Sequence, residues 1–208
     1  VIYMKQFNFK LYKGSMQYLL FFDALFREKQ INKEHYLLDN NITPSSYRRA
    51  RTSEHKVGRE ILDKISTFFG YKITPKEVVD KLETLATKIY HAMNYKIFKS
   101  YDEDLEYLKS LLKESYLIEP VIELLILFLN INSTKSVKVV IQDNLELYNK
   151  IKNYKSFYTD ELLVIYDLTN IYFEGEDDEE IRMKKYDNAM AYFILSSQSF
   201  RNEKYVEA

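Results

Sequence analysis

Three arginines lie within a span of four residues in the segment 43–52, whose sequence is TPSSYRRART. Arg48, Arg49 and Arg51 each carry a planar guanidinium fork, which matches both a phosphate group and the O6 and N7 edge of guanine. Thr43 and Pro44 precede them. This pair is typical of a helix start, because threonine caps the helix and proline has no N–H that needs a partner. The segment therefore predicts a short basic helix that binds an anion.

A second short helix is predicted just before this one. It runs from Asn32 to about Asn40 and is followed by a turn at Asn41, since asparagine tolerates the left-handed backbone conformation. In the basic helix, Tyr47 and Ala50 are three residues apart, so both are expected to face inward while the serines and arginines point elsewhere. A short helix, a tight turn and a capped basic helix are typical of a helix-turn-helix DNA reader.

The stretch from Leu25 to Tyr71 resembles the lambda-repressor-like (Xre-type) helix-turn-helix regulators. It departs from their pattern at Leu37, where the family prefers a small residue, and at Asn40, where an apolar residue is usual. Gly70 stands where a C-cap would close the last helix. The residues that fall on the core positions of the family are Leu25, Ile31, Ile42, Tyr47, Ala50, Ile61, Leu62, Ile65, Phe68 and Phe69.

The resemblance implies that the start of the basic helix enters the major groove of double-stranded DNA. Arg48 and Arg49 are then the best candidates for bidentate contacts to guanine or for phosphate clamps. Lys33, at the start of the preceding helix, is expected to meet the DNA backbone. The candidate DNA-binding residues are Lys33, Thr43, Pro44, Ser45, Ser46, Arg48, Arg49 and Arg51.

Composition predicts an all-α protein without a catalytic site. Among 208 residues there are four glycines and three prolines, and 46% of the residues are hydrophobic. The absence of cysteine excludes disulfides, thiolate catalysis and Cys-ligated zinc. The three histidines (His35, His55 and His91) stand alone, and neither a phosphate-cradling glycine loop nor a nucleophile motif occurs. We therefore expect no enzyme activity, no metal and no cofactor.

The charges divide unevenly along the chain. Residues 1–75 hold 13 Lys+Arg against 7 Asp+Glu, whereas residues 76–208 hold 17 against 24. This distribution favours a DNA-binding N-terminal part, called the head (residues 1–75), and an acidic remainder, called the body (residues 76–208), which phosphate groups repel. The longest apolar run, Val121 to Leu129, contains Glu123 and is too short for a membrane span. With no export signal and no cysteine, the cytoplasm is the expected compartment.

The second part of the chain predicts a series of helices. Thr74 and Pro75 repeat the cap pattern, and apolar residues then recur at helical spacing through several segments with short joints. The segment 186–196 resembles the second helix of a tetratricopeptide repeat through Ala189, Phe193 and Ser196. We therefore predict two domains, a helix-turn-helix domain at residues 1–73 and an α-solenoid of tetratricopeptide-like helical hairpins at 74–208, with a plain helical bundle as the alternative. We expect the helical series to continue beyond Ala208, or a partner to cover its end.

A helix-turn-helix head on such a body is similar to the Rgg/PlcR/AimR peptide-sensing regulators. This resemblance implies a homodimeric transcriptional regulator whose body binds a short signalling peptide. Asparagine amides on apolar helices can donate and accept hydrogen bonds with the backbone of a bound peptide. The candidates are Asn130, Asn144 and Asn170. Two other classes stay open, namely a helical-repeat scaffold for protein partners without specific DNA binding and an RNA-binding helical protein.

Overall fold

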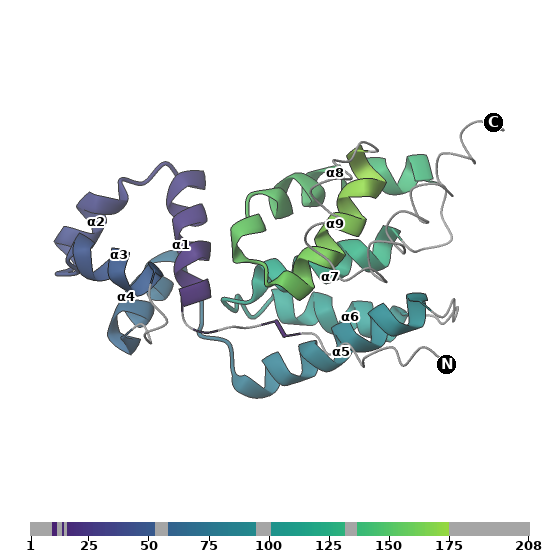
Figure 1. Cartoon of the computed structure of the whole chain (residues 1–208), viewed down its shortest axis with the longest axis horizontal. Coiled ribbons are helices and arrows are strands. Elements are labelled where there is room, and N and C mark those ends of the chain that lie inside the picture. Colours follow the sequence, from purple (N-terminus) through teal and green to yellow (C-terminus); the bar gives the residue numbers. More distant parts are fainter. Residues whose placement is uncertain are drawn as a thin grey trace.

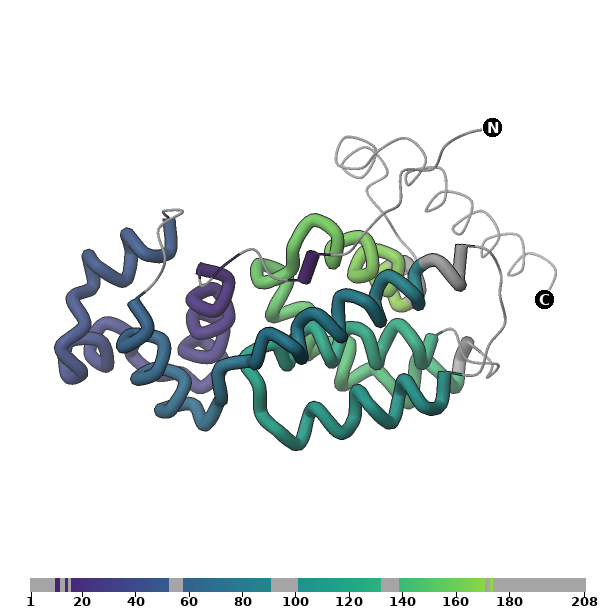
Figure 2. The backbone as a smooth tube through the Cα atoms, turned by 90° about the horizontal axis from the view of Figure 1, so that it is seen from below, coloured from purple at the N-terminus to yellow at the C-terminus, as the bar shows by residue number. Residues whose placement is uncertain are grey.

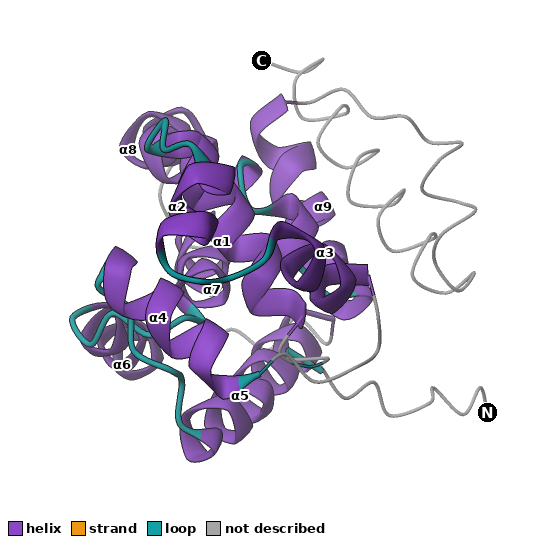
Figure 3. Cartoon of the chain, turned by 90° about the vertical axis from the view of Figure 1, so that its left-hand side faces the viewer, coloured by secondary structure: helices purple, strands orange, loops and turns teal. Residues whose placement is uncertain are grey.

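The predicted all-α class is confirmed. A computed structural model describes residues 10–11, 14, 16–52, 58–94, 101–131 and 137–174, and the regular elements in these ranges are helices (Figures 1 and 3). Across this described part, no helix combines the length and the apolar character that a membrane crossing requires. In order, the helices are α1 (Met16–Glu28), α2 (Lys33–Asp39), α3 (Pro44–Thr52), α4 (Arg59–Phe69), α5 (Lys76–Asn94), α6 (Asp102–Leu112), α7 (Glu119–Ile131), α8 (Val137–Lys152), the 3-10 helix η1 (Lys155–Phe157) and α9 (Asp160–Glu174).

The predicted starts and stops of the first helices are confirmed. Asn32 caps α2 with its side-chain oxygen, which accepts a backbone N–H of the first turn at 3.1 Å. Thr43 caps α3 in the same way at 3.2 Å. Asn41, in the turn between them, has a φ of 58°, and Gly70 ends α4 with a φ of 78°. Local side-chain chemistry therefore defines the ends of these short helices.

The second Thr-Pro pair differs from the prediction. The cap pattern at Thr74 predicts a helix that starts at Pro75, but α5 begins at Lys76. The hydroxyl of Thr74 instead accepts the N–H of Ile118 at 3.1 Å and hydrogen-bonds Tyr18. Thr74 is buried, and a buried N–H such as that of Ile118 needs a partner. The threonine therefore links α1 to the segment that leads into α7, rather than capping its own helix.

Helix α1 lies between the other helices of the head and the body (Figure 1). It packs against α3 and α4 on one side and against η1 on the other. The ring of Phe21 meets Tyr71, Tyr154 and Phe157 edge-on, with ring centroids 5.1, 5.2 and 5.8 Å apart. Gln17 is buried beside them, and its Nε2 donates to the carbonyl of Phe157 at 2.7 Å. Edge-on aromatic pairs each add about 0.5–1.5 kcal/mol beyond burial, so this cluster firmly joins α1 to the body.

Helix α7 is the centre of the body. It contacts α6, α8 and α9, and every residue from Pro120 to Leu129 is buried. This burial accounts for the apolar run from Val121 to Leu129, which lies inside the core. Figure 2 shows α5 and α6 running along the body, and of these two helices α6 packs against α7. The α-solenoid arrangement stays a prediction, since the tetratricopeptide-like segment 186–196 lies outside the described residues.

Packing continues across residue 73, where the domain boundary is predicted. Lys72 exchanges backbone hydrogen bonds with the segment before α7, at 2.8 Å to Ser115 and 3.0 Å from Leu117. The hydroxyl of Tyr71 donates to the carboxylate of Glu119 at 3.2 Å. The buried apolar residues of both parts form one core. The division into two domains stays a prediction, but the two parts share a packed junction.

A charged residue lies inside the most apolar helix. Glu123 of α7 is 6% exposed, and its Oε1 accepts from Lys150 Nζ of α8 at 2.5 Å. Lys150 also reaches Glu119 at 3.2 Å. Burial raises the pKa of Glu123 to about 7, because Lys150 offsets only part of the desolvation and the carboxylates of Glu119 and Glu28 oppose a further charge. This carboxyl therefore carries a proton more readily in the folded chain than in the unfolded one.

The variant Glu123→Gln tests whether the raised pKa of this carboxyl makes the stability of the fold depend on pH. Because the folded pKa of about 7 lies above the ordinary value of 4.5, Glu123 stabilises the fold below pH 4.5, and this contribution is lost as the pH rises through 7. Relative to the variant, the parent should lose up to about 1.4 kcal/mol of unfolding free energy per pH unit in this window. Urea denaturation across the window measures the difference. The exposed Glu114→Gln is the control, and parallel curves for parent and Glu123→Gln would contradict the assignment.

Candidate nucleic-acid interface

Helices α2 and α3 are joined by a tight hydrogen-bonded turn at the end of the head (Figure 3). The N–H of Asn41 donates to Leu38 at 3.0 Å, and that of Ile42 donates to Leu37 at 2.8 Å. Leu37, bulkier than the residue of the resembled family, is 1% exposed and lies in the core. The side chain of Asn40 donates to a carbonyl one turn earlier in α2 at 2.9 Å. Both departures from the family pattern are thus accommodated.

Tyr47 anchors α3 to α1. It is the buried residue of α3, and Ala50 is half-buried one turn later. The Tyr47 hydroxyl donates to the carbonyl of Leu19 at 3.2 Å and lies 3.1 Å from Oδ1 of Asp23. Burial, and next to it the charge of Asp23, raise the pKa of Tyr47 far above its ordinary value, so the hydroxyl keeps its proton as a donor. This anchor determines which side of α3 faces outward.

Asp23 of α1 is a site residue that sequence reasoning missed. Its Oδ1 lies 2.8 Å from Lys33 Nζ, and its Oδ2 lies 2.9 Å from Arg51 Nη1. The carboxylate is 12% exposed. Two predicted DNA-binding cations are therefore held on either side of a single carboxylate, which offsets part of their charge. The available signal was a lone acid in the apolar stretch YLLFFDALF.

Arg48 and Arg49 lie on the outward side of α3. Both side chains are exposed, and neither forms a hydrogen bond or an ion pair with a residue that the structure describes. They differ in this from Arg51, which Asp23 holds. The two guanidinium groups are thus the cations of α3 whose donors face solvent, as recognition of a base edge or a phosphate requires.

The first turn of α3 is organised by Thr43. Its hydroxyl accepts the N–H of Ser46 at 3.2 Å, donates to the hydroxyl of Ser46 at 2.7 Å, and lies 3.3 Å from that of Ser45. Thr43 and Ser45 are exposed, while Pro44 and Ser46 are half-buried. The helix therefore begins at the surface, where its backbone N–H groups favour an anion.

The three asparagines predicted for peptide binding bridge neighbouring helices. Asn130 Nδ2 donates to Asn144 Oδ1 at 2.7 Å, which joins α7 to α8. Asn144 Nδ2 donates in turn to the Val140 carbonyl at 2.8 Å. Tyr148 donates its hydroxyl proton to Asn170 Oδ1 at 2.6 Å, which joins α8 to α9. Their amides thus already serve the packing of the body.

The surface formed by α2 and α3 can bind anions through the donors of Arg48, Arg49, Arg51 and Lys33. In the part of the chain that the structure describes, His, Asp and Glu side chains form no group of three or more that could hold a metal ion.

No protein-family model matches this chain, and no curated protein or solved structure matches it either. The geometry of the site therefore carries the functional argument.

Replacing Asp23 tests its role as the anchor of α2 and α3. Asp23→Ala removes three interactions of a nearly buried carboxylate, so the free energy of unfolding should fall by about 1.5–3 kcal/mol. Asp39→Ala is the matched control, because among the described residues Asp39 forms an ion pair only with the exposed His35, at 2.9 Å, and its removal should cost less than about 1 kcal/mol. Urea denaturation compares the two variants. Equal losses would show that Asp23 is no anchor.

Proposed function

We propose that this protein is a DNA-binding transcriptional regulator whose head reads duplex DNA with α3. The observation that carries the proposal is the two-sided character of that helix. Tyr47 is 2% exposed and holds the inner side of α3 on α1, while Arg48 and Arg49 project from the outer side. A short basic helix that is rigidly held and follows a tight turn is suited to the major groove, which admits one helix.

In this proposal the cations of the head divide into two groups. Arg48 and Arg49 read base edges, since a guanidinium fork bonds the O6 and N7 atoms of guanine. Lys33, at the start of α2, and Arg51, in the last turn of α3, are held by Asp23, so they suit the neighbouring phosphates, which position a protein without reading sequence. The excess of basic residues in the first 75 residues supports the same orientation of the head toward DNA.

The double variant Arg48→Ala/Arg49→Ala tests the assignment of α3. Affinity for an operator selected from random duplex DNA should fall by about 1–3 kcal/mol for each arginine that reads a base. Folding should be preserved, because both side chains are exposed. Fluorescence anisotropy with labelled operator measures the affinity, and circular dichroism checks the fold.

The matched control is Lys109→Ala/Lys113→Ala, which removes two exposed positive charges from α6 and the residue after it. If both double variants lose affinity equally, the loss reflects net charge rather than recognition by α3. If the parent shows no salt-dependent binding to any duplex, the regulator proposal fails and the helical-repeat scaffold is favoured instead.

We also propose that the regulator acts as a homodimer, since helix-turn-helix readers commonly pair two half-sites about 34 Å apart. The body exposes two apolar side chains of α8, with Val139 at 43% and Leu145 at 49% exposure. The head exposes Leu38 of α2 and Phe68 of α4. We favour the body, because a dimer contact through the head would compete with DNA for the small surface of α2 and α3.

Sedimentation of the full chain tests this interface. Val139→Lys/Leu145→Lys should convert a dimer into a monomer, because it places two charges in an apolar contact. Leu38→Lys serves as the control and should leave the dimer intact. The opposite pattern would move the interface to the head, and a monomeric parent at tens of micromolar would remove the dimer from the proposal.

Control by a short signalling peptide belongs to the same proposal. It is supported by the resemblance to peptide-sensing regulators and by the presence of a large helical body behind the head. Asn130, Asn144 and Asn170 do not support it, since their amides already join α7, α8 and α9. A peptide that binds the body without changing operator affinity would leave dimerisation as the role of this part of the chain.

A further inference from the structure

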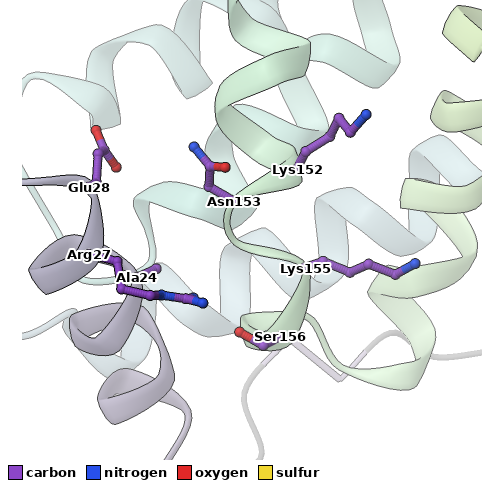
Figure 4. A pocket seen from close by; sticks show the side chains of 7 residues that line it. All are labelled: Ala24, Arg27, Glu28, Lys152, Asn153, Lys155 and Ser156. Carbon is purple, nitrogen blue, oxygen red and sulfur yellow. The ribbon is translucent and has the colours of Figure 1, made fainter.

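A groove follows the outer side of α1 and continues to the end of α8. It consists of two adjoining pockets of about 360 and 550 Å³, which share Arg27 and Ser156. The smaller pocket touches the candidate interface of the head, and the larger one lies against η1 (Figure 4). The cations that line the groove are Arg51, Lys33, Arg27, Lys155 and Lys152.

Negative charge in the lining of this groove is small. Asp23 is shared by Lys33 and Arg51, as described above. Glu28, the other lining carboxylate, accepts the hydroxyl proton of Tyr154 at 2.9 Å. The two pockets are therefore lined by five basic side chains and two acidic ones, so basic residues are in excess.

The body's share of these cations comes from a basic segment in an otherwise acidic part of the chain. Between Glu146 and Asp160 the sequence contains three lysines and no acid. Lys150 turns inward to Glu123, while Lys152 and Lys155 are exposed. The acidic body therefore presents positive charge at the place where it adjoins the candidate interface of the head.

The form of the groove suits an extended polyanion better than a small ligand. Every lining residue of the larger pocket except Ala24 is exposed. Figure 4 shows Arg27 projecting from α1, and Lys152 and Lys155 extending away from that helix. The ammonium groups of both lysines lie 5.3 Å from tyrosine rings of the body. The cations are thus spread along a surface, as for successive phosphates, instead of converging on one point.

We propose that Arg27, Lys152 and Lys155 form a second phosphate-binding surface, which contacts the DNA backbone beside the site that α3 reads. This inference rests on the proposed function and extends it from the head to the body. DNA bound by α3 continues along α1 and η1, and the basic segment 147–159 removes the repulsion that the acidic body would otherwise exert. The contacts are to phosphate, so they add affinity and carry no sequence information.

The test compares two triple variants of the full chain. Arg27→Gln/Lys152→Gln/Lys155→Gln neutralises the groove, and Lys76→Gln/Lys109→Gln/Lys113→Gln removes the same charge from exposed positions of α5 and the α6 region, outside both pockets. Anisotropy of labelled operator over a potassium chloride series gives the slope of log affinity against log salt. Each phosphate that the groove variant no longer neutralises should reduce the magnitude of this slope by about 0.9, while the preference for operator over scrambled duplex stays unchanged.

The possible outcomes separate the two proposals. A smaller slope in the groove variant alone supports the inference, whereas equal changes in both triple variants, or none in either, overturn it. If Arg48→Ala/Arg49→Ala weakens binding and the groove variant does not, the inference fails while the proposed function stands. If the parent binds no duplex, both fail. Calorimetry with inorganic pyrophosphate tests whether the groove binds a small anion instead of DNA. The polyanion assignment would be overturned if the parent formed a stoichiometric complex with pyrophosphate, the groove variant did not, and the salt slope of DNA binding were the same in both.

Discussion

Helix α1 is apolar on nearly all sides, and the rest of the fold depends on covering it. Eight of its thirteen residues are buried, among them Phe21, Phe22 and Leu25. Each large apolar side chain contributes about 1.5–3 kcal/mol when it leaves water, so neither side of this helix is stable in solvent. Helices α3 and α4 cover one side and η1 covers another. The outward orientation of α3, on which DNA binding is proposed to depend, is set by this packing.

Polar side chains inside the apolar helices determine which partners these helices take. Gln17 and Asp23 in α1, and Glu123 in α7, each bond a residue far away in the sequence. A buried polar group without a partner costs about 1–3 kcal/mol, so an alternative packing that leaves one of them unpaired is disfavoured. The few polar residues of the core therefore add specificity to an apolar packing that many arrangements would satisfy.

The helices and their ends could be predicted from the sequence, because they depend on neighbouring residues. Side-chain pairings between residues far apart in the sequence could not be predicted. Apolar spacing indicated the helices, and the cap residues Thr43 and Gly70 indicated the start of α3 and the end of α4, because these signals act within one helical turn. Lys33 and Arg51 meet at Asp23 from positions 10 and 28 residues away, and no local pattern reveals such a meeting. Thr74 failed as a cap for the same reason, since the N–H of Ile118 outcompeted its own helix. In the proposed interface, residue types were predictable, but their pairing was not.

The shared position of α1 has a consequence for how the chain unfolds. Opening this helix exposes apolar surface of the head and of the body at once. Even a partial opening of α1 therefore has a high free energy. Its amide hydrogens should then exchange with solvent only through global unfolding, together with those of α7. A proteolytic cut near Ile73 would leave two fragments that remain associated through Phe21, Tyr154 and Phe157. In terms of cooperativity, the packing of α1 against both parts leads us to expect that the described helices unfold as one unit, although the sequence divides into two parts.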